Sequence, residues 1–151
     1  MKQTLYIKLL LFCLIGFAAA CDKFESQNTS VPEEAEKVID GTWKITKATR
    51  NGVDITGLMD FSQFRIRFNH DKTYSIANYL PFVVKADGTW SLDDPQYPFH
   101  LNLIENGSSE TFTSTFNYPV VNGKRTILLS FSPGCRNNIY TYSFEKETSE
   151  N

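Results

Sequence analysis

The segment Phe64-Arg65-Ile66-Arg67-Phe68 alternates apolar and charged side chains without a break. Such a period of two predicts a β-strand with one buried face and one solvated face. The same alternation recurs in seven further segments, which are separated by turn signals such as Asp87-Gly88 and Asn122-Gly123. We therefore expect eight strands, the other seven being centred on residues 43–46, 74–77, 90–92, 99–103, 112–116, 127–131 and 140–144.

The eight predicted strands fit between Gly41 and Lys146 and are joined by short connections. Short connections favour antiparallel pairing of sequential strands, and closure into a barrel removes the exposed sheet edges. The fold class that we expect is therefore all-β, an eight-stranded antiparallel up-and-down barrel over residues 31–147. A helix-capping pattern, Ser30-Val31-Pro32-Glu33, predicts one short N-terminal helix near residues 32–39.

Gly41-x-Trp43 follows the predicted helical turn and opens the first predicted strand. This arrangement resembles the lipocalin and calycin group, and the chain as a whole is similar to uncharacterised lipocalin-like lipoproteins of Bacteroidota, which have no assigned activity. The resemblance spans about residues 38–146 and implies a lipocalin-like barrel. Authentic lipocalins carry a helix after the last strand, where this chain has residues 147–151. They also pack an arginine over the tryptophan, and the candidates for that role here are Arg136 and Lys146.

Residues 1–20 have the features of a secretory signal peptide. Lys2 and Lys8 give the segment a positively charged start. An apolar run follows over residues 9–17, and the small residues 18–20 then mark a cleavage point. The run is too short to span a membrane, which takes about 20 residues. Cys21 follows directly, which resembles the lipobox of bacterial lipoproteins and implies a lipid-acylated cysteine. The alternative is a plain secretory signal followed by an unrelated cysteine.

Residues 21–30 are polar and lack periodicity, so we interpret them as the acylated cysteine and a flexible tether. Residues 148–151 are interpreted as a polar tail. These assignments predict a location in the cell envelope, with the outer membrane as the expected membrane and the leaflet left open. The membrane is then a partner through the N-terminal lipid.

The signal peptide takes two of the 15 Lys and Arg residues, which leaves 13 against 17 acidic residues in the mature chain. A mildly acidic chain without Lys/Arg clusters argues against a nucleic-acid partner and against electrostatic membrane binding. After loss of Cys13 and acylation of Cys21, Cys135 is alone, so no internal disulfide can form. We interpret Cys135 as a small buried hydrophobe rather than as a reactive thiol.

Alternate connections of an up-and-down barrel lie at the same end, so the first and third connections should meet there. Both are rich in apolar side chains, namely Val53, Ile55, Leu58, Met59 and Phe61 in the first and residues 79–84 in the third. These side chains predict either the entrance of a ligand cavity or a patch that contacts a partner. Alternatively, Pro81 marks a bulge and residues 82–84 continue a strand into the core.

The ligand that we expect is a small apolar or amphipathic molecule at the open end of the barrel. The candidate ligand-binding residues are Trp43, Met59, Phe61, Phe64, Tyr74, Phe82, Trp90 and Tyr142. The large volume of the aromatic side chains argues against a hollow interior, because eight strands enclose a space that side chains can just fill. The alternative function is therefore a protein–protein interaction module of the cell envelope, with a filled barrel and no ligand.

The sequence contains no recognisable motif for catalysis, cofactor binding or metal binding. His70 and His100 lack a cysteine or carboxylate at ligand spacing, so no zinc site is expected. No nucleophile elbow, P-loop or dinucleotide fingerprint occurs. Asp93-Asp94-Pro95 is interpreted as a turn. We therefore expect no metal, no cofactor and no enzymatic activity; an enzyme would require Asp93, Asp94 and His100 to converge in a cleft.

Overall fold

The computed structural model describes residues 33–79, 82–134 and 137–148. The predicted signal peptide, the tether with Cys21, and Cys135 lie outside the described residues. All strands belong to one compact unit, Ala35–Asn151. In chain order the described elements are β1 (Gly41–Arg50), β2 (Val53–Asp54), the short 3-10 helix η1 (Thr56–Leu58), β3 (Arg65–Phe68), β4 (Thr73–Ala77), β5 (Gly88–Leu92), β6 (His100–Glu105), β7 (Thr111–Asn117), β8 (Val120–Val121), β9 (Lys124–Phe131) and β10 (Tyr140–Lys146).

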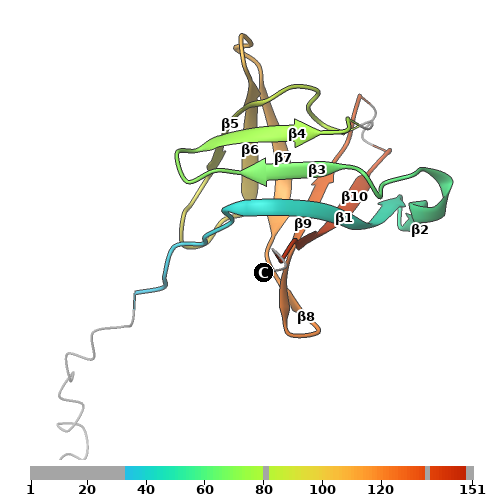
Figure 1. Ribbon diagram of the computed structural model, residues 1–151, viewed down its shortest axis with the longest axis horizontal. Coiled ribbons are helices and arrows are strands. Elements are labelled where there is room, and N and C mark those ends of the chain that lie inside the picture. The colour runs from blue at the N-terminus through green and yellow to red at the C-terminus, as the bar shows by residue number, and fades with distance from the viewer. Residues whose placement is uncertain (1–32, 80–81, 135–136, 149–151) are drawn as a thin grey trace, which may run out of the picture. The chain divides into compact units, whose positions relative to one another are not determined.

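Antiparallel pairing closes the sheet into a barrel (Figure 1). The barrel strands pair in the order β1-β3-β4-β5-β6-β7-β9-β10, and β10 returns to pair with β1. Two short strands lie outside this circuit, since β2 pairs with the end of β1 and β8 forms a hairpin with β9. The predicted all-β, eight-stranded antiparallel barrel is confirmed, and its strands are the eight that period-two alternation indicates.

The core forms because alternate side chains of each strand point into the barrel. In β3, Ile66 and Phe68 are buried whereas Arg67 is exposed, and the same alternation buries Leu101 and Leu103 of β6. Alternation in the predicted strand over residues 99–103 places Phe99 on the same inward face as Leu101 and Leu103, but Phe99 is 69% exposed. It precedes β6, where its N–H donates to a side-chain oxygen of the 93–99 connection rather than to a neighbouring strand.

The predicted N-terminal helix is not formed in residues 33–40, which have no regular secondary structure. Their backbone groups are used in tertiary contacts. Lys37 N–H donates to Pro95 O at 2.8 Å, and Ile39 O accepts the indole N–H of Trp43 at 2.8 Å. Backbone groups that bond to other parts of the barrel are not available for a helical turn, so these contacts outweigh the local capping signal.

Both Gly-Thr-Trp triplets of the sequence depend on their glycine. Gly41 has φ +124°, a conformation that glycine adopts without the steric cost of a side chain. Gly88 is buried, and a Cβ placed on it would overlap the backbone carbonyl of Ile104 in β6. The tryptophan of each triplet is buried and donates its indole N–H to a backbone carbonyl. The triplets therefore fix the starts of β1 and β5.

Arg125 of β9 is the cation that stacks on the aromatic cluster at Trp43, and it was not among the predicted candidates. Its guanidinium carbon lies 5.3 Å from the ring centroid of Tyr118. The Tyr118 ring in turn lies 6.2 Å from the Trp43 ring in an edge-on arrangement. Lys146 is the register partner of Trp43 in β10, and Arg136 lies outside the described residues.

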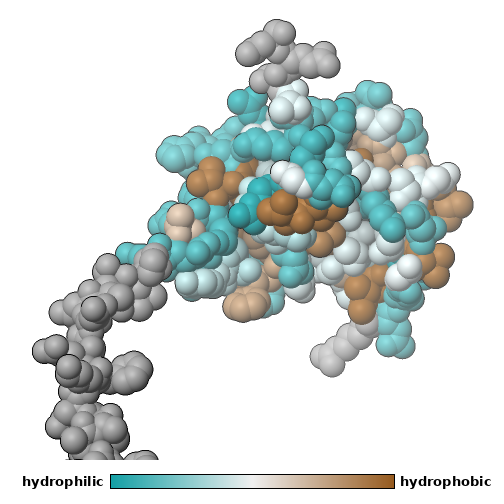
Figure 2. Space-filling view, turned by 90° about the horizontal axis from the view of Figure 1, so that it is seen from below, coloured by the Kyte–Doolittle hydropathy of each residue, from teal (hydrophilic) through white to brown (hydrophobic). Residues whose placement is uncertain are grey.

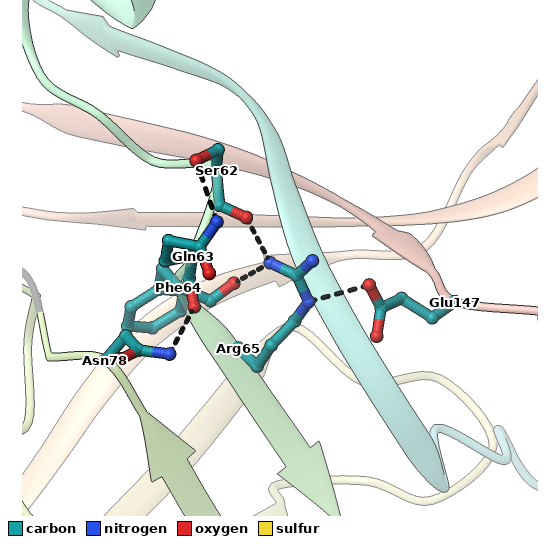
Figure 3. A network of polar contacts seen from close by, with 6 residues as sticks. All are labelled: Ser62, Gln63, Phe64, Arg65, Asn78 and Glu147. Atoms are coloured by element: carbon teal, nitrogen blue, oxygen red, sulfur yellow. Dashed lines mark hydrogen bonds and ion pairs between the residues drawn. The ribbon is translucent and has the colours of Figure 1, made fainter.

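Arg65 forms hydrogen bonds on the outer surface of the barrel with segments on both sides of β1 (Figure 3). Its Nη1 donates to the carbonyls of Ser62 at 2.6 Å and Phe64 at 2.8 Å. Its Nε donates to Glu147 Oε1 at 2.7 Å, and the Glu147 backbone N–H donates to Thr42 O at 2.8 Å. The network joins the approach to β3 with the chain that leaves β10.

Candidate functional site

Strand direction gives the barrel two ends. The pocket end carries the connections 51–64, 78–87, 106–110 and 132–139. The tether end carries residues 35–40 and the connections 69–72, 93–99 and 118–123. A pocket of about 610 Å³ lies at the pocket end, a size typical of small-molecule sites. Met59 of the first connection and Phe82 of the third both line it, so the two apolar connections share one end as predicted.

One wall of the pocket is a stack of three aromatic rings from β9 and β10. The ring of Phe131 lies 5.6 Å from that of Tyr142 with an interplanar angle of 18°, and 6.1 Å from that of Tyr140 with an angle of 17°. Tyr140 is the cross-strand partner of Phe131, and Tyr142 lies two residues further on the same face. The wall is therefore flat and apolar.

Phe82 forms the floor of the pocket. Its ring lies 5.8 Å from that of Phe131 and 5.6 Å from that of Tyr142, which are both in the wall. On its other side it contacts Phe64 at 5.3 Å and Phe144 at 5.9 Å, which are both buried in the core. The space below Phe82 is thus filled by side chains, and the pocket lies above the core.

The pocket opens where β7 separates from β9. The pairing of these strands ends at Thr115 and Ser130, although β7 begins four residues earlier at Thr111. Thr111 and Thr113, which line the pocket, belong to the part of β7 that pairs with β6 but not with β9. Phe112, between them, packs against the core and also lines the pocket. The gap between β7 and β9 therefore forms one side of the pocket.

The described lining of the pocket has few groups that can carry a charge. Lys85 is the charged residue among the described lining residues, which include no histidine or carboxylate. Burial raises the pKa of Tyr142, with smaller contributions from Tyr140 and Tyr79, so its hydroxyl stays protonated at neutral pH. The described lining therefore combines an apolar surface with one cation.

Three of the eight predicted ligand-binding residues line this pocket, namely Met59, Phe82 and Tyr142. The other five are buried at 0–5% exposure in the core: Trp43, Phe61, Phe64, Tyr74 and Trp90. The sequence places Tyr140 beside Tyr142 on the inner wall of the barrel, but it does not single out Phe131 or Phe112, which also line the pocket. These residues could be identified from their positions, because each is an inward-facing residue next to a connection of the pocket end.

A family model described as a domain of unknown function, DUF5004, matches residues 20–145. The chain belongs to the DUF5004 family. No curated protein and no solved structure matches it at a level that shows a relationship. The DUF5004 match begins one residue before Cys21 and extends into β10, so it covers the segment before the barrel as well as the barrel strands.

A second polar arrangement in the DUF5004 domain lies at the tether end. Asp93 Oδ2 is 2.9 Å from His100 Nδ1, and Asp93 Oδ1 accepts the backbone N–H groups of Phe99 and His100 at 2.9 Å each. These hydrogen bonds hold the pKa of Asp93 well below its usual range, and the bond from the His100 backbone N–H contributes most. Asp94 instead accepts the N–H of Gln96 at 2.8 Å within the predicted turn. Two of the three residues named for an enzyme thus meet, at the opposite end from the pocket.

In the described part of the DUF5004 domain, no group of three or more His, Cys, Asp and Glu side chains is placed to hold a metal ion. Within those same residues, no helix combines the length and the apolar character needed to cross a membrane. The expectation of a protein without cofactor or enzymatic activity stays a prediction.

Proposed function

We propose that this DUF5004 protein is a lipid-anchored bacterial lipoprotein of the cell envelope, held to the outer membrane through Cys21. Its lipocalin-like barrel binds a small apolar or amphipathic molecule at the pocket end, without catalysis. The observation that carries the proposal is the pocket of about 610 Å³ between the aromatic wall and the gap beside β7. The resemblance to lipocalin-like lipoproteins supports it.

The chemistry of the lining indicates the ligand class. The rings of Phe131, Tyr140 and Tyr142 offer apolar surface to a planar ring or an acyl chain, which gains free energy when it leaves water. Lys85 at the edge of the same pocket offers a cation to a carboxylate or phosphate group. An amphipathic molecule with an anionic group satisfies both.

Two neighbouring residues of the first connection provide a matched test of ligand binding. Met59 lines the pocket, whereas Leu58 is 79% exposed and does not line it. Native mass spectrometry of residues 22–151, purified from the host without detergent, should show an added mass that leaves on denaturation. Met59→Asp should lose this mass because a carboxylate enters the apolar pocket, and Leu58→Asp should keep it. A bare wild-type protein would contradict ligand binding.

Membrane attachment has its own test. Cys21→Ser removes the sulfur that carries the acyl chain, so the protein should shift from the membrane fraction to the soluble fraction or accumulate unprocessed. Metabolic labelling with a radioactive or clickable fatty acid should mark the wild type and not the variant. Identical labelling and fractionation of both proteins would contradict the anchor.

A second candidate function is docking onto another envelope protein. It is favoured by four exposed apolar side chains around the pocket end, Val53 (67%), Leu58 (79%), Tyr79 (47%) and Ile139 (50%). A photo-crosslinker at Leu58 in cells should give a discrete crosslinked protein if this surface docks. The same Leu58 site should give no discrete product if the pocket end serves a small ligand.

A further inference from the structure

Exposed apolar side chains also gather at the tether end, where the pocket does not reach. They are Val38 (64% exposed), Tyr97 (59%), Phe99 (69%), Val120 (57%) and Val121 (48%). Hydrogen bonds join the segments that carry them, since Lys37 N–H donates to Pro95 O and the Tyr118 hydroxyl donates to Val38 O. Figure 2 views the molecule from the side on which β8 projects in Figure 1 and shows hydrophobic patches among hydrophilic residues. Such a surface marks a contact with a partner.

The β8–β9 hairpin is the most prominent part of this surface (Figure 1). Val120 pairs with Arg125 and Val121 pairs with Lys124. The turn between them, Asn122-Gly123, has φ values of +51° and +77°, which suit a tight two-residue hairpin. Each exposed valine therefore lies directly opposite a cation. Apolar side chains next to Lys and Arg are typical of segments that lie in the membrane interface.

Lys124 of the hairpin shares a groove with three further cations. Lys44, Arg67, Lys124 and Lys146 line one groove of about 720 Å³ together with Glu145 and Glu147. Within the described residues, none of the four cations forms an ion pair with a carboxylate. They come from four consecutive barrel strands, so register rather than sequence brings them together.

Three carboxylates of the tether end are instead engaged inside the protein. Each is held by a neighbouring side chain: Asp40 by His70 at 3.0 Å, Asp93 by His100 at 2.9 Å and Glu147 by Arg65 at 2.7 Å. Lys44, Arg67, Lys124 and Lys146, by contrast, have no carboxylate partner within the described residues, so the groove that they share with Glu145 can receive an anionic group.

The path of the chain favours a membrane as this partner. Residues 35–40 lead into β1 at the tether end. If Cys21 carries the lipid, the eleven residues from 22 to 32 span at most roughly 40 Å, at about 3.6 Å per residue. A tether of this length keeps the tether end near the lipid surface at high effective concentration, which adds to a contact that the tether end makes by itself.

We propose that the tether end is a membrane-contact surface for anionic phospholipid headgroups. Val120 and Val121 enter the boundary between headgroups and acyl chains, and Lys124 and the groove meet the lipid phosphates. The pocket end then faces away from the membrane. This inference shares the lipid anchor with the proposed function but is independent of what the pocket binds.

Flotation with lipid vesicles tests the contribution of the exposed valines of the hairpin. Residues 22–151 without an acyl chain retain the compact unit that holds all described strands. This protein should float with vesicles of phosphatidylcholine and phosphatidylglycerol. Val120→Ser/Val121→Ser should reduce the bound fraction, whereas Val53→Ser/Leu58→Ser, a more exposed apolar pair at the pocket end, should not. Equal binding by both variants, or no binding by the wild type, would overturn the proposal; circular dichroism checks that both fold.

A second variant and its control test the contribution of the groove cations. Lys124→Gln/Lys146→Gln should weaken binding to vesicles that contain phosphatidylglycerol by about 25-fold, roughly five-fold for each cation. Lys47→Gln, on the same barrel but outside both the groove and the pocket, should leave binding unchanged. If inorganic phosphate displaces the vesicles at low concentration, the groove is a site for a free anion and the membrane assignment is wrong. Pocket occupancy in the valine variants, read by native mass spectrometry, shows whether the proposed function stands regardless of this result.

Discussion

The ring of Phe82 lies 5.3 Å from the ring of Phe64, centroid to centroid, so a residue of the third connection is part of the barrel core. Phe82 is 7% exposed although it belongs to no strand. It closes the barrel beneath the pocket and serves as the pocket floor. A change at Phe82 therefore acts on stability before it acts on binding.

We predict that Phe82→Asp lowers the free energy of unfolding by about 3–5 kcal/mol, because it removes a buried ring and adds a carboxylate without a partner. Tyr79→Asp, in the same connection, should change it by about 0.5 kcal/mol or less, since Tyr79 is 47% exposed. Urea unfolding followed by tryptophan fluorescence measures both. Equal midpoints for Phe82→Asp and wild type would show that Phe82 is not in the core.

The second prediction concerns Gly88. Gly88→Ala places a Cβ against the Ile104 carbonyl and the Tyr74 ring, so β5 must move away from β6. We expect a loss of about 3 kcal/mol, at the upper end of the range for overpacked cores. Gly57→Ala is the matched control, because nothing lies within 4 Å of its Cβ. The control should be neutral or stabilising in thermal unfolding, and a similar loss in both variants would contradict the close approach.

The barrel is predictable from sequence because its main signal is local. Alternation in segments such as Phe64–Phe68 shows which side chains face inward, and short connections leave few ways to pair the strands. The same argument placed Met59 and Phe82 at one end, since alternate connections of a meander share an end. The inward position of Phe99 was wrong because the nearby Asp93 side chain holds its backbone N–H outside the sheet. The N-terminal helix was wrong because contacts distant in sequence override the local capping pattern.

The remaining features depend on register, which alternation does not show. The aromatic wall requires Phe131 to lie opposite Tyr140. The opening requires the pairing of β7 with β9 to stop at Thr115. Likewise, the overall acidic balance of the chain conceals a cluster of cations, because Lys44, Arg67 and Lys146 become neighbours only when β10, β1 and β3 pair.

The third prediction is a change in alkaline stability. Tyr74 is 1% exposed, and its hydroxyl has no hydrogen-bond partner among the described residues. Burial, helped by Glu105 and Asp87, raises its pKa above the ordinary value of 10.0. Above pH 10 the unfolded chain therefore loses this proton while the folded barrel retains it. Stability should fall as the pH rises past that value.

Tyr74→Phe removes both the unpaired hydroxyl and this titration. We expect it to raise the free energy of unfolding by about 1 kcal/mol at neutral pH and to make stability decline less above pH 10. Tyr97→Phe, at an exposed position, should follow the wild type. Denaturant midpoints between neutral pH and pH 11 measure both effects. A destabilised Tyr74→Phe would mean that the hydroxyl does have a partner.

The last prediction concerns acid stability at the tether end. The carboxylate of Asp93 accepts backbone N–H groups of Phe99 and His100 and pairs with the His100 ring, so its pKa lies below the ordinary value of 3.8. A lowered pKa means that, as the pH falls below that value, the unfolded chain takes up the proton before the folded barrel does. The stabilisation by Asp93 is therefore complete at neutral pH and is lost progressively in acid.

Asp93→Asn keeps the shape of the side chain but removes its charge. It should lower the urea midpoint at pH 7, and the difference from wild type should shrink as the pH is brought below 3.8. Glu110→Gln, an exposed change in the connection between β6 and β7, is the control and should leave the midpoint unchanged. Because Asp93 holds the connection that carries Tyr97 and Phe99, the variant should also bind vesicles less well. A difference from wild type that is the same at pH 7 and at pH 3 would mean that the charge of Asp93 is not what stabilises the connection.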